Sequence, residues 1–118
     1  MKFSILSFES PAEIGRRTGP DAKAYVDGWM AYSAALRAAG VFVSGAALQA
    51  THTATTIRSK DGKRLVQDGP YADTKEQFGG FYIIEVPSLD AALEWAAKSP
   101  ALPSGAVEVR PLIPMPPQ

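Results

Sequence analysis

Three side chains in the middle of the sequence have the chemistry of a general acid or base: His52, Asp68 and Glu76. His52 is the only histidine, and imidazole titrates closest to neutral pH. A carboxylate becomes a useful base when burial raises its pKa. Asp68 is the best such candidate, because it would lie on the apolar side of a predicted hairpin. A structural role competes with this one, since Asp68 precedes Gly69-Pro70 and can shape that turn through its side chain.

Polar and aromatic side chains near these three could hold a small ligand. Arg58 and Lys75 could stabilise an anionic intermediate, and the hydroxyl of Thr55 would face Asp68 across the hairpin. The candidate ligand-binding residues are Thr55, Arg58, Tyr71, Lys75 and Tyr82.

The composition excludes several classes of function. Twelve basic and twelve acidic side chains cancel, and the isoelectric point is about 6.6, so no long-range field attracts nucleic acid or acidic lipid. There is no cysteine, and one histidine with scattered carboxylates does not form a recognisable metal shell. We therefore expect no metal, no bound cofactor, no nucleic-acid partner and no membrane association.

The 118 residues suit one domain, 1–118, with a proline-rich tail at 111–118. No stretch reaches the ~18 apolar residues of a membrane span, and the N-terminus lacks a signal-peptide pattern. We expect a cytoplasmic protein.

Hydrophobic periodicity and turn signals give the order of elements. Strands are predicted at 2–8, 41–48, 54–59, 64–68, 81–86 and 106–110, and helices at 22–39 and 89–98. In the first helix, Tyr25, Trp29, Tyr32 and Leu36 form one stripe, which is typical of a face packed on a sheet, although aromatic rings can also stack on a ligand. Residues 9–20 are predicted as a loop. Charges there, such as Glu9 and Arg17, could face a ligand or serve solubility alone.

Asp61-Gly62 predicts a two-residue hairpin loop between 54–59 and 64–68. That loop fixes the register, so that Ile57 faces Val66 and Thr55 faces Asp68 on one side, while Arg58 faces Leu65 on the other.

This order predicts an α+β fold, a ferredoxin-like βαββαβ sandwich with an extra hairpin. Both helices would cover one face of the sheet. The strands at 2–8, 41–44 and 81–86 carry apolar side chains on both faces, so the helix-free face also needs cover. A second copy would supply it by symmetry. We therefore expect a homodimer through the helix-free sheet face.

Three runs in the second half of the chain form an uncommon combination: Asp68-Gly69-Pro70-Tyr71, Thr74-Lys75-Glu76 and Gly79-Gly80. With their surroundings from 54 to 111 they resemble the DGPF-domain branch of the YCII-related proteins. Tyr71 stands where the phenylalanine that names the branch is usual. The resemblance implies a dimeric α+β barrel. It also implies an accessory role in sigma-factor regulation, or an acid–base activity such as dehalogenation. The histidine–aspartate pair proposed for the wider group does not transfer, because the helix at 22–39 has no histidine.

Two functions remain as hypotheses. One is a small dimeric accessory or small-molecule-binding module, which predicts a pocket that is shallow or filled by Trp29, Tyr82 and Trp95. The other is a cofactor-independent lyase, isomerase or dehalogenase acting on a small anionic metabolite, which predicts a concave pocket with Asp68 directed inward.

Overall fold

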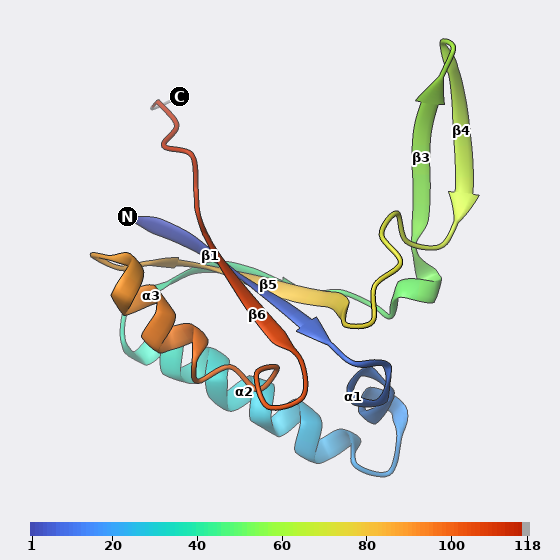
Figure 1. Cartoon of the computed structure of the whole chain (residues 1–118). Helices are drawn as coiled ribbons and strands as arrows, with labels where there is room; N and C mark the ends of the chain where they lie inside the picture. The colour runs from blue at the N-terminus through green and yellow to red at the C-terminus, as the bar shows by residue number, and fades with distance from the viewer. Residues whose placement is uncertain (117–118) are drawn as a thin grey trace.

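A computed structural model describes residues 1–116 and contains two sheets (Figure 1). Helices α2 and α3 lie below the larger sheet, and a two-stranded hairpin rises above it at one end. Two short 3₁₀ helices, Arg16–Thr18 and Thr51–Thr53, link the main elements. These elements are β1 (Lys2–Glu9), α1 (Pro11–Gly15), α2 (Ala22–Ala38), β2 (Phe42–Ala47), β3 (Thr55–Lys60), β4 (Lys63–Asp68), β5 (Gln77–Glu85), α3 (Leu89–Ala96) and β6 (Ala106–Pro111).

The larger sheet has the strand order β2-β5-β1-β6, and every neighbouring pair is antiparallel. Of the three strands predicted to carry apolar residues on both faces, β1 and β5 occupy its centre, whereas β2 does not. The predicted ferredoxin-like α+β frame is therefore confirmed. β2 lies at an edge and changes register between Phe42 and Ser44.

The core lies between the sheet and the two helices. Alternation along β1 buries Phe3 and Ile5, and the same face continues to Ser7 and Glu9 at the end of the strand. Ile84 of β5 and Leu36 of α2 are each fully buried against this face. The strand face that builds the core thus also carries two polar side chains to one end of the sheet.

The helix α2 confirms most of its predicted stripe: Tyr25, Tyr32 and Leu36 are buried, and Trp29 is half-buried. The helix α3 buries its small side chains rather than its large ones. Ala92 and Ala96 are buried, whereas Leu89 and Leu93 are 49% and 47% exposed. Because alanine side chains are small, a helix that packs through them can lie close to the sheet. The longer leucines then lie at the edge of the helix–sheet contact.

The predicted loop at 9–20 contains the helix α1. Ser10 caps this helix by accepting a hydrogen bond from the Glu13 backbone N–H at 3.2 Å, and Pro11 occupies its first turn. Both residue types are typical of a helix start, so the signal was present in the sequence.

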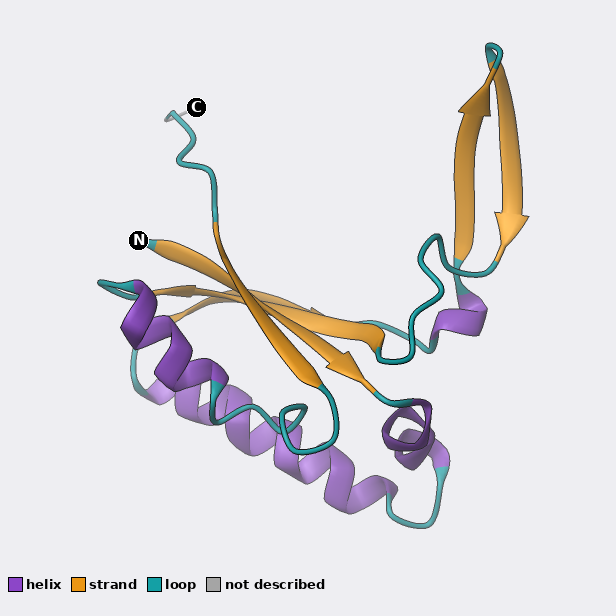
Figure 2. Ribbon diagram, viewed as in Figure 1, coloured by secondary structure: helices purple, strands orange, loops and turns teal. Residues whose placement is uncertain are grey.

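The hairpin β3–β4 forms a sheet of its own, which we call the arm (residues 55–68; Figure 2). Its register agrees with prediction at every pair, including Ile57 with Val66 and Thr55 with Asp68. Asp61 and Gly62 have φ angles of 53° and 77°, the left-handed values of a type I′ turn. Local turn chemistry therefore fixes the pairing in the arm.

Among residues 1–116, no helix combines the length and apolar character that crossing a bilayer requires.

Candidate functional site

A cavity of about 470 Å³ lies between α2 and the sheet. Its wall is mostly apolar, with aromatic side chains from α2, β2 and β5, including Trp29, Phe42 and Tyr82. The volume falls within the range of small-molecule sites. The cavity is not filled by Trp29 and Tyr82, and Trp95 does not line it.

One end of the cavity carries a buried carboxylate, Glu9, which is 1% exposed. The hydroxyl of Tyr25 lies 2.8 Å from its Oε1 and 2.7 Å from its Oε2, so a single hydroxyl proton is shared between the two oxygens. Arg17 donates from Nε to the Tyr25 oxygen at 3.1 Å, and its Nη2 lies 3.7 Å from Glu9 Oε1. A buried charge is tolerated when it is paired and hydrogen-bonded in this way.

The phenol of Tyr25 holds its proton at neutral pH. Burial raises its pKa, and Glu9 raises it further, although the Arg17 hydrogen bond acts in the opposite direction. The direction of the network is therefore fixed, from Arg17 N–H to Tyr25 O–H to the Glu9 carboxylate. In this network Glu9 is the group with lone pairs to offer to a ligand.

Ser7 lies two residues before Glu9 on the same face of β1, and it also lines the cavity. The residue is 1% exposed, and its hydroxyl has no hydrogen-bond partner within residues 1–116. Leaving a buried hydroxyl unpaired costs about 1–3 kcal/mol. A ligand with a polar atom beside Ser7 would recover that loss.

Gly79 of β5 makes room for this arrangement. A Cβ atom at Gly79 would lie 3.0 Å from Arg17 Nη2 and 3.3 Å from Glu9 Oε1, closer than most real contacts. Arg17 also donates to the backbone carbonyls of Gly79, at 3.2 Å, and of Leu48. These bonds tie the guanidinium to β5 and to the end of β2.

Aromatic rings close the opposite end of the cavity. Trp29 and Tyr82 lie nearly parallel, with ring centroids 6.4 Å apart and an interplanar angle of 20°. Phe42 meets Tyr82 edge to face at 6.1 Å, and the Tyr82 hydroxyl bonds with Ser33. Arg37 also lines this end, with its Cζ 3.9 Å from the Phe42 ring centroid. The cavity thus has an aromatic end covered by one cation and a second end that holds the Glu9 network.

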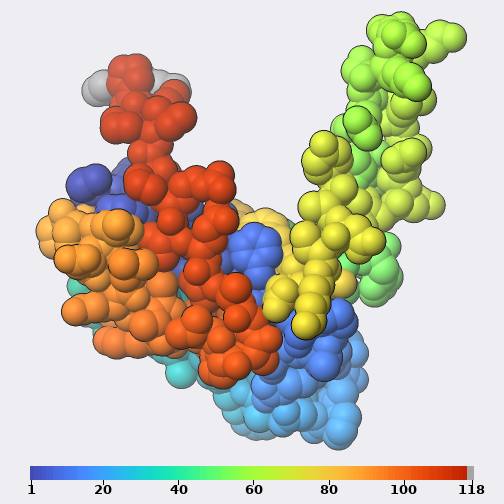
Figure 3. Space-filling model, in the orientation of Figure 1, coloured from blue at the N-terminus to red at the C-terminus, as the bar shows by residue number. Residues whose placement is uncertain are grey.

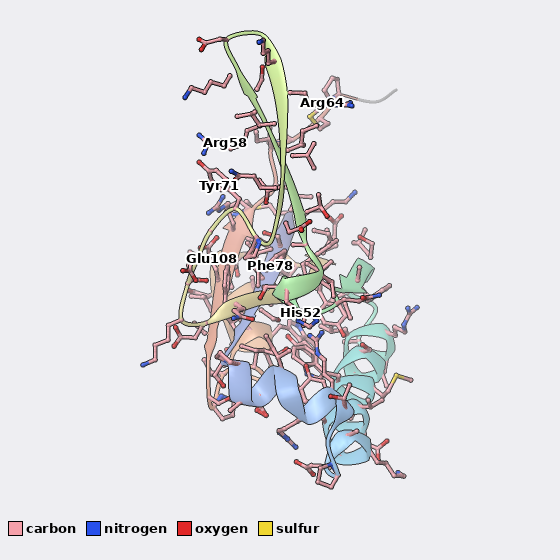
Figure 4. All side chains as sticks on the ribbon, turned by 90° about the vertical axis from the view of Figure 1, so that its right-hand side faces the viewer. His52, Arg58, Arg64, Tyr71, Phe78 and Glu108 are labelled. Carbon is pink, nitrogen blue, oxygen red and sulfur yellow. The ribbon has the colours of Figure 1, made fainter. Side chains whose placement is uncertain are left out.

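Of the residues predicted from sequence, Tyr82 lines this cavity. Six others lie on the arm or on the segment that follows it, and none lines either cavity of the described chain: Thr55, Arg58, Asp68, Tyr71, Lys75 and Glu76. Asp68 is exposed rather than enclosed, and it lines neither of the two cavities described here. Tyr71 turns back onto the arm, where Arg58 Cζ lies 5.6 Å from its ring centroid (Figure 4).

His52 lies at the base of the arm, apart from Arg58 and Tyr71 (Figure 4). It lines a second, open cavity with Thr51, Gln77 and, from the far side, Arg17. Glu9 and Tyr25 are not part of that cavity, so His52 does not join the buried network. The catalytic and ligand-binding roles assigned from sequence stay predictions. Across residues 1–116, no three His, Cys, Asp or Glu side chains gather as a metal site would require.

Sequence reasoning placed Glu9 and Arg17 in a loop and left their role open, and it did not consider Ser7. One signal in the sequence could have located Ser7 and Glu9. Extending the β1 alternation by one residue puts Ser7 and Glu9 on the face of Phe3 and Ile5.

Comparison with known proteins adds a fold and a family. A solved structure of 5-chloro-2-hydroxyhydroquinone dehydrochlorinase (TftG) from Burkholderia phenoliruptrix, in complex with 2,5-dihydroxybenzoquinone, matches with a TM-score of 0.52. That match covers 96% of this chain and 94% of the other at 20% identity, which supports the shared fold. An uncharacterized protein of Rhizobium meliloti is 52% identical over 69 residues, which are 57% of this chain and 56% of that relative. The family model of the YCII-related domain matches residues 1–116, and the chain belongs to that family.

Proposed function

We propose that this chain binds a small, flat molecule in the cavity between α2 and the sheet, and that Glu9 exchanges a proton with it. The observation that carries the proposal is the pairing of a buried carboxylate with an unpaired serine hydroxyl at one end of a mostly apolar cavity. Convergent polar groups in a mostly apolar cavity are the usual mark of a ligand site.

The lining favours an aromatic ligand with hydroxyl groups at one end. Trp29, Phe42 and Tyr82 offer ring faces and edges to a planar molecule. Glu9 accepts hydrogen bonds, so the ligand needs an O–H or N–H donor on that side. Ser7 can donate to or accept from a neighbouring oxygen. A phenol with two adjacent oxygen substituents meets each of these requirements.

Glu9 is the proton acceptor in this proposal, and Tyr25 and Arg17 are positioning residues. The Tyr25 hydroxyl orients the carboxylate, and Arg17 supplies positive charge to the ionised form. A ligand hydroxyl donated to Glu9 passes its proton to the carboxylate and leaves negative charge on the ring. In a chlorinated ring of this kind, delivery of that proton to the chlorine-bearing carbon, loss of a second hydroxyl proton and departure of chloride give a hydroxyquinone and HCl, and no oxidant is needed. A chain that works in this way is an enzyme that uses general acid–base catalysis.

The named activity of the structural neighbour supports this reading. That protein is a dehydrochlorinase of a hydroxyhydroquinone, and its structure holds a dihydroxybenzoquinone, a flat ring with two hydroxyl groups. The same shape and polarity suit the cavity described above.

The test uses Glu9→Gln, which keeps the size of the side chain, and Asp68→Asn as a control on the arm. Ligand binding is measured by calorimetry with 2,5-dihydroxybenzoquinone, and turnover by chloride release from 5-chloro-2-hydroxyhydroquinone. We expect the wild type and Asp68→Asn to bind alike, and Glu9→Gln to bind at least tenfold more weakly and to release no chloride. Wild-type protein that binds no hydroxylated ring, or equal binding by Glu9→Gln, would reject the proposal.

Binding without catalysis is the second candidate, and one observation favours it. Both oxygens of Glu9 already contact the Tyr25 hydroxyl, and Arg17 stands beside them, so the carboxylate is held as an acceptor. A small-molecule-binding module would show the same loss of affinity in Glu9→Gln, with no chloride release by the wild type.

A further inference from the structure

The chain exposes more surface than a compact protein of its size. A 12.6 kDa monomer is expected to expose about 6,200 Å², whereas this one exposes 8075 Å². Its radius of gyration is 16.1 Å, against about 13.5 Å for a compact chain of this length. The surplus of roughly 1,900 Å² exceeds the ~800 Å² that each partner buries in a standard interface.

The arm is one source of this surplus. One of its faces carries Ile57 and Val66 opposite each other, at 61% and 60% exposure. An isolated two-stranded hairpin is at best marginally stable in water, and it needs a hydrophobic face packed on something else. Tyr71 and Arg58 meet on the opposite side of the arm. The Ile57–Val66 face has no such neighbour within the described chain.

The helix-free face of the larger sheet also lacks cover. Leu6 and Phe8 of β1 and Phe81 and Ile83 of β5 point away from the buried face of their strands. They are only partly buried, and α2 and α3 lie on the opposite side of the sheet. The arm rises on the helix-free side, clear of the rest of the chain, which we call the body (Figure 3). Two apolar surfaces therefore stand beside each other, one on the sheet and one on the arm.

A homodimer through the helix-free sheet face is already the expectation from the sequence. Within that dimer, we propose that the arm of each copy acts as a clasp on its partner through Ile57 and Val66. A two-fold interface gives each arm the same receiving surface by symmetry. The charges are complementary as well: the arm carries four basic and two acidic side chains, so the remainder of a chain with no net charge carries two more acids than bases. An arm of one copy is thus attracted to the body of the other.

The experiment compares two neighbouring positions on β4. Val66→Asp places a charge on the proposed clasp face, and Leu65→Asp places the same charge on the opposite face, because adjacent residues of a strand point to opposite sides. Sedimentation equilibrium of the full chain gives the dissociation constant. Far-UV circular dichroism reports whether each variant keeps its fold.

We expect a wild-type dimer, twice 12.6 kDa, and at least 100-fold weaker association for Val66→Asp, because the symmetric interface contains the change twice. Leu65→Asp should associate within about threefold of the wild type. Amide hydrogen exchange adds a readout without mutation: β3 and β4 should be protected in the dimer and exchange rapidly on dilution. A monomeric wild type would overturn the proposal. So would a dimer with an unprotected arm, or equal effects of the two substitutions.

Discussion

The body and the arm of this chain each contain an isoleucine opposite a partner in an antiparallel pair, and the surroundings of the two residues differ completely. Ile5 faces Tyr82 and Val109 in the middle of the sheet and is fully buried between the sheet and the helices. Ile57 faces Val66 in the arm and is 61% exposed. The turn at Asp61-Gly62 sets the pairing in the arm, whereas Ile5 pairs with strands far along the chain. In both places burial depends on what covers the strand.

The same contrast separates the buried network around Glu9 from the candidate residues on the arm. Glu9 gains its environment from β1, α2, β5 and the 3₁₀ helix at Arg16–Thr18, which meet around it. Asp68 has an arm strand on one side and is otherwise exposed. A buried carboxylate with fixed partners has the setting that proton transfer needs, and an exposed one does not.

The largest expected effect comes from comparing two isoleucine truncations. Ile5→Ala removes buried methyl groups from the core and should lower the free energy of unfolding by about 2–5 kcal/mol. Ile57→Ala removes the same atoms from an exposed site, so in dilute solution its effect should stay within about 0.5 kcal/mol. Urea unfolding at two protein concentrations checks both values. A concentration-dependent loss in Ile57→Ala alone would sharpen the contrast, because the clasp covers that residue only in the dimer.

A second comparison concerns two glycines of the body. Gly79→Ala would press its methyl group on Arg17 and Glu9, and overpacking of this kind costs about 1–3 kcal/mol. Gly28→Ala in the helix α2 meets nothing within 4 Å and should stabilise the chain by about 0.5–1 kcal/mol. Thermal unfolding of both variants shows whether each substitution raises or lowers the stability. Equal stability of the two would mean that the Arg17–Glu9 pair moves freely away from β5.

The pH dependence of stability tests the buried tyrosines of the body. Burial raises the pKa of both Tyr25 and Tyr32, so each folded phenol binds its proton more tightly than the unfolded one. Their contribution is complete below the ordinary tyrosine pKa of about 10 and is lost as pH rises through the folded values. Urea unfolding from pH 8 to pH 11 should show this alkaline decline.

Tyr32→Phe isolates one of the two phenols. The Tyr32 hydroxyl donates to the Trp95 carbonyl at 2.8 Å. Its loss should therefore cost about 0.5–1.5 kcal/mol at pH 8. Above pH 10 the variant should decline less steeply than the wild type, because one titrating group has gone. A parallel decline in both proteins would show that other groups, such as lysines, set the alkaline limit.

Signals within a few residues predicted much of the fold. Asp61-Gly62 fixed the arm register, Ser88 caps α3 by accepting from the Ala91 N–H, and apolar residues on both faces of 2–8 indicated a central strand. The buried network was harder to predict, since Glu9, Arg17 and Tyr25 come from separate elements. The apolar neighbours of Asp68 on the arm suggested burial, but whether a hairpin is covered depends on the tertiary arrangement rather than on its own sequence.

The smallest expected effect is that of Asp68→Asn, and it bears directly on the choice between the two carboxylates. Asp68 is exposed at the end of β4 and faces Thr55 across the arm, so removing its charge should change the free energy of unfolding by no more than about 0.5 kcal/mol. Because no cavity reaches it, ligand binding should be unchanged as well. Calorimetry with 2,5-dihydroxybenzoquinone on Asp68→Asn, with Glu9→Gln measured in parallel, decides the point. A variant that folds normally but binds more weakly than the wild type would place Asp68 near the ligand. The arm of a partner copy would then have to reach the cavity, so a mixed dimer of Asp68→Asn and Glu9→Gln subunits would keep one intact site, made of Glu9 from the first subunit and Asp68 from the second, whereas a dimer of two Asp68→Asn subunits would keep none.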